Sequence, residues 1–244
     1  MTEIIILFVV ALVIILRLRS EFGKTSEEEK TDIQNKIRQM QEDAKNQSQS
    51  CNNGFNNQNL WNKKPDSSNQ NQDEIKIIGS SSTDNDNPIL NNLSYTQKNQ
   101  LLKALESLEM SVDFFTNGLK KAFTIIIESF ANGNEKDLQN LEFLSSKDIY
   151  QNFYNSIKNR QNNGKKLNTQ IIEIKDIKII AVTQISTIIT ISAEFTSLQI
   201  NYITNDNLEI TEGSNNEIIE LIDKWSFAKD LSNSQENWKL VATN

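Results

Sequence analysis

The spacing of hydrophobic positions changes along this chain, and each spacing predicts a different kind of element. Residues 4–18 are almost uninterruptedly apolar. From Ser94 to Gly164 the apolar side chains recur at intervals of three and four, the period of a helix, and after Gly164 they alternate with polar ones, the period of a strand. The pattern therefore predicts an apolar N-terminal segment, then helices, then a sheet.

The apolar N-terminal segment is predicted to anchor the chain in a membrane. A cleavable secretory signal carries its positive charge ahead of the apolar core, whereas here Glu3 precedes the core and Arg17 and Arg19 follow it. As a helix, residues 4–18 span about 22 Å of a hydrocarbon layer roughly 30 Å thick, so Arg17 has to snorkel to extend the span. The alternative is a helix lying in the interface, but such helices have a wide polar face that this segment lacks. We expect a single transmembrane helix over residues 1–19.

The charges behind the anchor predict the side of the membrane on which the rest of the chain lies. Arg17, Arg19 and Lys24 follow the apolar segment directly. Positive residues that flank a transmembrane helix stay on the cytoplasmic side. The N-terminus is therefore expected outside, with residues 20–244 in the cytoplasm or in an equivalent matrix.

Residues 20–93 are predicted to form a tether, first charged and then rich in Asn and Gln. Residues 26–45 carry mixed charges and a helical spacing of apolar residues, which favours a short amphipathic helix. Residues 46–92 are dominated by Asn, Gln, Ser and Asp. Such a segment buries too little apolar surface to offset its chain entropy, so we expect disorder. Its apolar islands, among them residues 75–78, are either short docking motifs or neutral parts of a linker.

A folded domain is predicted over residues 94–244, and its first half is helical. Its strongest helix places apolar residues from Val112 to Phe130 on one wide face. Capping residues mark where the helices begin and end, since Ser, Asn and Asp favour helix starts and Gly favours helix ends. The predicted helix starts are Ser94 with Gln97, Asn134, which begins a short helix through Leu141, and Ser145 with Asp148. The predicted helix ends are Gly133 and Gly164.

The second half of the domain is predicted to be an antiparallel sheet. Residues 187–197 alternate strictly, and residues 171–182 alternate with a slip near Asp176 that predicts a bulge or two short strands. Residues 198–203 continue the sheet, and residues 218–231 and 238–242 add further strands. Helices followed by strands indicate the α+β class. Helices packed on one face of a curved sheet would form a cone with room for an interior pocket.

The composition excludes several functions. The net charge of −7 argues against a nucleic-acid partner. The chain has no histidine, which removes Ser–His and Cys–His catalysis and the commonest transition-metal ligand. Cys51 is the single cysteine, so neither a disulfide within the chain nor a thiolate zinc site can form. Glycine-rich nucleotide-binding motifs are missing as well. We predict no metal, no cofactor and no nucleic-acid partner.

Two segments resemble a known family. The helix FTNGLKKAFTIIIESFANGN at residues 115–134 resembles the helix that opens the C-terminal domain of Tim44-like proteins, including the bacterial TimA-type members. The strand pair WSFAKD and NWKLVAT, at 225–230 and 237–243, resembles the characteristic end of that family. The likeness covers residues 111–244. Lys229 and Asn134 depart from it, since the family more often has arginine and aspartate there.

The resemblance implies a nuclear-transport-factor-two-like cone located at an inner membrane. Mitochondrial relatives link the preprotein channel to a heat-shock chaperone, and a sister branch is a ribosomal protein that holds ribosomes near the membrane. By this likeness the chain would be a single-pass adaptor or scaffold of the bacterial inner membrane, with its C-terminal domain in the cytoplasm. It would bind protein partners, such as a chaperone, a translocon or a ribosome, and the membrane lipid bilayer.

The aromatic residues of the domain are the candidates for a partner or lipid pocket. For each of them, an ordinary place in the hydrophobic core is the simpler interpretation. The candidates are Phe115, Phe123, Trp225, Phe227 and Trp238.

An enzyme is the alternative function, because this cone architecture also hosts catalysts of the ketosteroid-isomerase type. Asp223 is the candidate carboxylate, since it shares a strand face with apolar neighbours. Tyr150, Tyr154 or Tyr202 would be the proton donor. No motif singles these residues out, and an aspartate paired with a lysine is the simpler interpretation. We therefore favour an adaptor over an enzyme.

Overall fold

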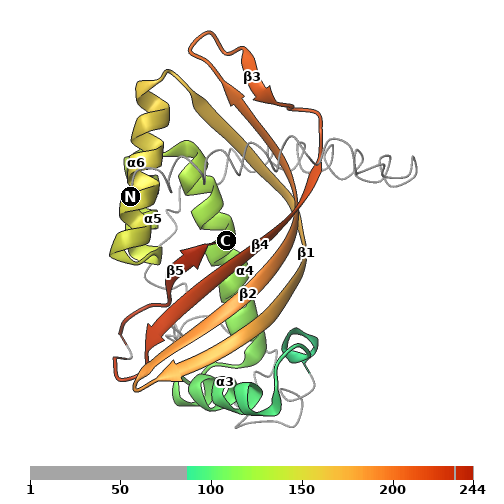
Figure 1. Cartoon of the computed structure of the whole chain (residues 1–244), viewed down its shortest axis with the longest axis vertical. Coiled ribbons are helices and arrows are strands. Elements are labelled where there is room, and N and C mark those ends of the chain that lie inside the picture. Colours follow the sequence, from blue (N-terminus) through green and yellow to red (C-terminus); the bar gives the residue numbers. More distant parts are fainter. Residues whose placement is uncertain (1–86, 234, 244) are drawn as a thin grey trace, which may run out of the picture. The chain divides into compact units, whose positions relative to one another are not determined.

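The chain folds as helices followed by strands, which confirms the predicted α+β class (Figure 1). A computed structural model describes residues 87–233 and 235–243. The helices are η4 (Pro88–Leu90, a 3-10 turn), α3 (Tyr95–Ser107), α4 (Val112–Asn132), α5 (Glu135–Leu144) and α6 (Lys147–Asn162). The strands are β1 (Lys166–Ile185), β2 (Ile188–Thr204), β3 (Ile210–Gly213), β4 (Ile219–Asp230) and β5 (Lys239–Thr243).

The predicted capping residues begin and end most of the helices. Ser94 and Gln97 form the expected capping box at the start of α3: each side chain accepts a hydrogen bond from the backbone N–H of the other. Gly133 ends α4 with a left-handed backbone, φ 64°. The start of α6 differs by one residue, because its N-cap is Ser146 rather than Ser145. Ser145 is instead extended and bridges to Leu240, so the helix cannot begin until the next residue.

The strands form an antiparallel sheet in the order β1-β2-β4-β5, with β3 paired to the end of β2. β1 is one continuous strand with register shifts, including one between Ile174 and Asp176, so the predicted bulge near Asp176 is confirmed. Residues 198–203 continue the sheet as predicted, as the second part of β2. The sequence did not predict β3, whose four residues are too few for a visible alternation.

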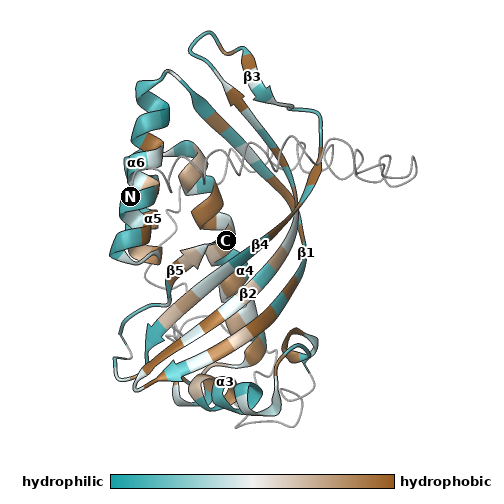
Figure 2. Ribbon diagram, in the orientation of Figure 1, coloured by the Kyte–Doolittle hydropathy of each residue, from teal (hydrophilic) through white to brown (hydrophobic). Residues whose placement is uncertain are grey.

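Helix α4 packs its apolar face against the inner face of the sheet, and this contact forms the core (Figure 1). The predicted alternation in β2 points every second residue at that helix, so hydrophobic bands recur along the strands (Figure 2). The core residues from α4 and β2 are at most 1 % exposed. They are Val112, Phe115, Leu119, Ala122, Phe123, Ile126, Ile189, Ile191, Ala193 and Phe195.

Most predictions for the N-terminal part fall on residues that the structure does not describe. The anchor over residues 1–19, its flanks Arg17 and Arg19, and the tether up to residue 86 lie outside the described residues. None of the described helices is long and apolar enough to cross a membrane.

The last seven residues of the predicted tether differ from expectation, since they pack against the domain. Asn87 caps η4 by accepting a hydrogen bond from the backbone N–H of Ile89, and Pro88 occupies the first helical position. Ile89 and Leu90 are 6 % and 1 % exposed and belong to the core. Two apolar residues in polar surroundings were too weak a signal to predict this contact.

Candidate functional site

The five predicted pocket residues lie where α4 faces β4 and β5. Phe123 of α4 stacks on Phe195 of β2, with ring centroids 4.4 Å apart, and lies 4.7 Å from the ring of Trp225 in β4. Phe115, two turns earlier on α4, contacts Trp238 at 5.1 Å. These aromatic pairs join the helix to the sheet at two levels.

All five residues are buried as part of the hydrophobic core. Phe115 and Phe123 are fully buried, Phe227 and Trp238 are 1 % exposed, and Trp225 is 6 % exposed. Phe195 completes the cluster and was missed as a candidate, although the alternation of its strand placed it on the same face. The side chains fill the space between helix and sheet with one another, so their role in binding a partner or a lipid stays a prediction.

The residues named for the enzyme alternative are only partly brought together. Asp223 is half-buried on the inner face of β4, directly opposite Phe195 in β2. Tyr202 lies seven residues after Phe195 on a strand whose side chains alternate, so it faces the other side of the sheet. Tyr150 and Tyr154 lie together on α6, with ring centroids 6.1 Å apart.

A half-buried arginine of α6 binds the end of α4. The guanidinium of Arg160 donates hydrogen bonds to the carbonyl oxygens of Phe130, at 2.5 Å, and Ala131, at 3.1 Å. It also lies over the Phe130 ring, 4.9 Å from the centroid. Burial lowers the pKa of Arg160 to about 10, so the group is still charged at neutral pH. A positive charge at the negative end of a helix is stabilising, and this contact joins α6 to the end of α4.

Lys229, one of the two departures from the family pattern, holds the connection between β4 and β5. Its side chain is buried, and its ammonium group donates to the carbonyl oxygens of Asn233, at 3.3 Å, and Glu236. Burial lowers the pKa of Lys229, and the carboxylates of Glu236 and Asp230 oppose that shift. The lysine therefore binds backbone carbonyls of its own chain, and bidentate binding of a carboxylate is not needed here.

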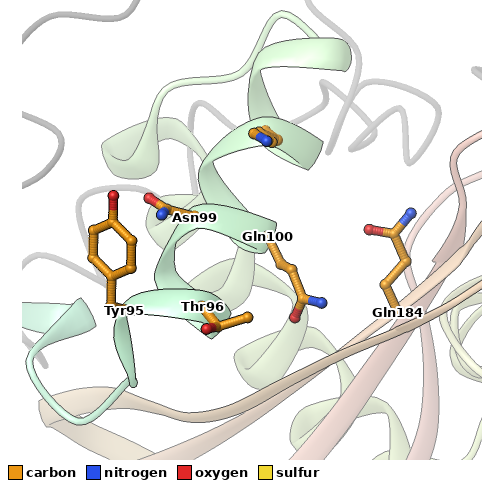
Figure 3. Close-up of a pocket in the computed structure, with 6 residues that line it drawn as sticks. Tyr95, Thr96, Asn99, Gln100 and Gln184 are labelled. Atoms are coloured by element: carbon orange, nitrogen blue, oxygen red, sulfur yellow. The ribbon is translucent and has the colours of Figure 1, made fainter.

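A polar pocket lies between α3 and the end of β1 (Figure 3). Its volume is about 240 Å³. Gln184 of β1 faces Thr96 and Gln100 of α3 across it (Figure 3). None of the site residues predicted from the sequence lies in this pocket. The pocket forms between segments some eighty residues apart in sequence, so no local sequence pattern could predict it. Its lining residues are Tyr95, Thr96, Asn99, Gln100, Lys103 and Gln184.

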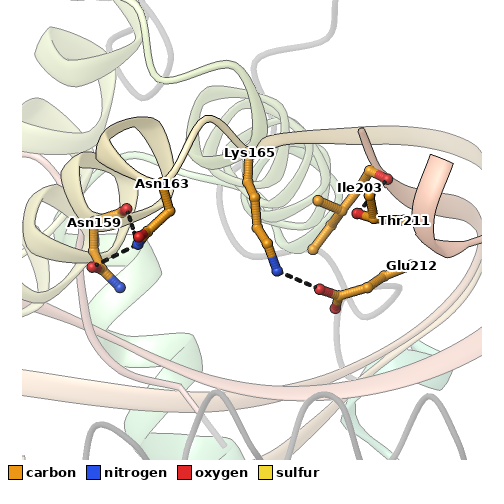
Figure 4. A network of polar contacts seen from close by, with 6 residues as sticks. All are labelled: Asn159, Asn163, Lys165, Ile203, Thr211 and Glu212. Atoms are coloured by element: carbon orange, nitrogen blue, oxygen red, sulfur yellow. Dashed lines mark hydrogen bonds and ion pairs between the residues drawn. The ribbon is translucent and has the colours of Figure 1, made fainter. Parts of the chain in front are cut away.

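The opposite end of the domain carries a network of polar contacts (Figure 4). The ammonium of Lys165, just before β1, lies 2.7 Å from the carboxylate of Glu212 in β3. Asn163 donates to the carbonyl oxygen of Asn159 at the end of α6. Both charged groups are partly exposed, so the ion pair contributes little to stability. Its effect is to hold β3 beside the connection from α6 to β1.

The described residues contain no group of three or more acidic, histidine or cysteine side chains that could hold a metal ion. The predicted lack of a metal or cofactor stays a prediction for the whole chain.

The fold and the site define an α+β domain whose helices cover an antiparallel sheet and whose interior is filled by aromatic side chains. The model of the Tim44-like domain matches residues 106–244, more than half of the chain, and the chain belongs to this family. The family resemblance read from the sequence is thereby confirmed.

Two further comparisons add little to this assignment. The chain is similar to the intermembrane space region of the chloroplast protein ARC6, known from a crystal structure. The identity is 11 %, the TM-score is 0.36, and the match covers 52 % of this chain and 92 % of that one. A comparison with curated proteins gave no match.

Proposed function

We propose that this protein is a membrane-anchored adaptor or scaffold whose Tim44-like domain binds protein partners beside the membrane. The observation that carries the proposal is the family match over residues 106–244, which covers α4 to α6 and all five described strands. In this proposal residues 1–19 anchor the chain, residues 20–93 tether it, and the domain is a nuclear-transport-factor-two-like cone.

The tether gives the adaptor its reach. A flexible chain of about seventy residues has a root-mean-square length near 45 Å, from roughly 5 to 6 Å times the square root of the residue number. A domain held within that distance of the membrane meets membrane-bound partners at a raised effective concentration. Modest affinity is then sufficient for a stable complex.

We place the chain in the bacterial inner membrane with a single pass and a cytoplasmic C-terminal domain. Cys51 tests this placement, because it is the single thiol and lies in the tether. A membrane-impermeant maleimide should label Cys51 in opened cells and leave it unlabelled in intact ones, with Cys51→Ser as the background control. Labelling in intact cells would contradict the topology.

Crosslinking in membranes tests the adaptor function. The full chain carrying an affinity tag is crosslinked in intact cells, and the captured proteins are identified by mass spectrometry. We expect enrichment of a chaperone, a translocon component or a ribosomal protein, each of which would identify a branch of the family. The capture should be lost with Phe123→Ala, which damages the domain, and retained with Phe55→Ala in the tether. A chain that captures lipid alone would contradict the adaptor assignment.

A further inference from the structure

Two exposed isoleucines form the tip of the β1–β2 hairpin. Ile185 and Ile188 are paired across a two-residue turn of Ser186 and Thr187, and Ser186 has the positive φ that such turns require, 55°. Their side chains are 79 % and 49 % exposed. The turn between β1 and β2 lies at the end of the sheet at which α3 lies (Figure 1). The tip therefore presents apolar side chains to the surroundings of the domain.

The hairpin behind this tip contains no charge. No Asp, Glu, Lys or Arg occurs between Lys178 and Glu194, and the exposed positions there are Thr, Gln, Ser and Ile. Moving a charged side chain out of water is costly, whereas hydroxyl and amide groups can bond to lipid headgroups and interfacial water. Residues 179–193 thus contribute no charge that would have to leave bulk water.

The surroundings of the tip are typical of a membrane–water interface. Tyr95 of α3 is 82 % exposed, and it lines the polar pocket together with Lys103 and Gln184. Tyrosine and lysine favour the headgroup level of a bilayer. Asp230 of β4 pairs with Ile188, and hydrogen bonds from Ser232 and from Thr187 of the turn lower the pKa of its carboxyl group. Its negative charge therefore lies at the tip itself and limits insertion to the headgroup level.

We propose that the tip of the β1–β2 hairpin, residues 184–188, inserts into the headgroup layer of the membrane in which the chain is anchored. This inference rests on the proposed anchor. Lipid is the occupant because two side chains are far below the roughly 800 Å² per partner that a stable protein interface buries. A few apolar side chains are sufficient at a bilayer when a second attachment already holds the chain there.

The opposite end of the domain supplies a matched control. Leu208 and Ile210 at the β2–β3 connection are 79 % and 43 % exposed, so this tip is as apolar as the first. Beside the ion pair of Glu212 with Lys165, it also carries the carboxylates of Asp206 and Glu209. These charges would be repelled by anionic lipid and are costly to desolvate. We therefore expect the β2–β3 connection to stay in water.

The test places a fluorescent label on each tip of the full chain. In a Cys51→Ser background, Ile185→Cys or Leu208→Cys is labelled with an environment-sensitive dye and reconstituted into vesicles of phosphatidylethanolamine and phosphatidylglycerol. We expect the dye at position 185 to shift to shorter wavelength and to be quenched by nitroxide-labelled lipid. The dye at position 208 should show neither effect. Adding Ile188→Glu should reduce the quenching at 185, whereas adding Ile210→Glu should leave it unchanged.

The possible outcomes distinguish a failure of the tip proposal from a failure of the anchor proposal. Flotation with the vesicles reports the anchor, so a chain that does not float contradicts the proposed function. A chain that floats without quenching at position 185 overturns the inference and leaves the anchor standing. Equal quenching at both positions overturns it too, because the contact would then not be specific to the β1–β2 tip. A spectral shift at 185 that occurs without lipid would assign the tip to a second copy of the chain instead.

Discussion

Gly133 at the end of α4 and Gly164 just after the C-cap of α6 have the same left-handed backbone but different surroundings. Their φ angles are 64° and 62°. A Cβ at Gly133 would collide with the side chain of Ile157, which is fully buried, whereas at Gly164 it would meet the carboxylate of exposed Asp206. Glycine is therefore required at both positions for the backbone conformation. At Gly133 it is also required for packing.

Alanine at these two glycines should separate strain from packing. We expect Gly133→Ala to lower the free energy of unfolding by about 2–4 kcal/mol, since left-handed strain and overpacking both contribute. Gly164→Ala should cost about 1–2 kcal/mol, because the Asp206 side chain can move aside. Urea denaturation followed by circular dichroism measures both. Equal losses at the two positions would show that the Ile157 contact does not matter.

Substitution of Asp223 tests the adaptor function against the enzyme alternative. Asp223→Asn removes a charge with almost no change of shape, so we expect partner capture in membranes to be unchanged. A catalyst that depends on this carboxylate would lose its turnover. If Asp223→Asn abolished partner capture while the chain still unfolded cooperatively, the aspartate would belong to the partner site and the assignment would need revision.

At the scale of elements, two charged residues of β4 organise the connection to β5. Lys229 binds the carbonyl oxygens of Asn233 and Glu236. Asp230 accepts hydrogen bonds from the backbone and hydroxyl of Ser232, at 2.9 Å and 2.7 Å. These polar contacts hold the loop between its apolar ends, Leu231 and Trp238, which pack on the core.

Removing the ammonium of Lys229 should loosen this connection. Lys229→Met keeps the apolar stem but leaves two carbonyl groups without their donor, which we expect to cost about 1–3 kcal/mol. Lys229→Arg keeps the charge and the donors, so it should lose less. Hydrogen exchange of the amides between β4 and β5 should speed up in the methionine variant and remain slow in the arginine variant. Unchanged exchange in both would contradict the contact.

Asp230 should make the domain sensitive to acid. Hydrogen bonds from Ser232 and Thr187 lower its pKa from the ordinary value of 3.8. A lowered carboxyl pKa stabilises the fold above that ordinary value, and this contribution is lost as the pH falls through the lower value in the folded state. Asp230→Asn should therefore flatten the acid side of the stability profile, measured as Tm against pH.

At the scale of the whole domain, the aromatic contacts of α4 link the helical half to the sheet. Phe123 contacts both β2 and β4 through Phe195 and Trp225. Helix and sheet come from separate parts of the chain, so this cluster makes them fold as one cooperative unit.

Truncating Phe123 should test that cooperativity. We expect Phe123→Ala to cost about 3–5 kcal/mol, as is usual for a buried phenylalanine. Phe143→Ala makes the same chemical change at a partly buried position on α5 and should cost clearly less. Circular dichroism and tryptophan fluorescence should still report one transition in both variants. Separate transitions for helices and strands would contradict a single core.

The sequence alone determined the elements, because periodicity and caps are local properties. The stripe of α4, the alternation of β2, the capping box at Ser94 and the end at Gly133 could all be predicted from side chains a few residues apart. The aromatic candidates could be predicted as a set, since each lies on an apolar face. Their mutual contacts could not, because these depend on how helix and sheet pack together.

Tertiary structure decided everything that depends on distant partners. Arg160 meets the end of α4 some thirty residues away, Ser145 bridges to β5, and residues 87–93 pack on the domain although their composition is that of the tether. The exposed isoleucines of the β1–β2 tip look in sequence like any other strand residues. Only the folded domain shows that they extend beyond its core, because exposure depends on where the neighbouring elements end.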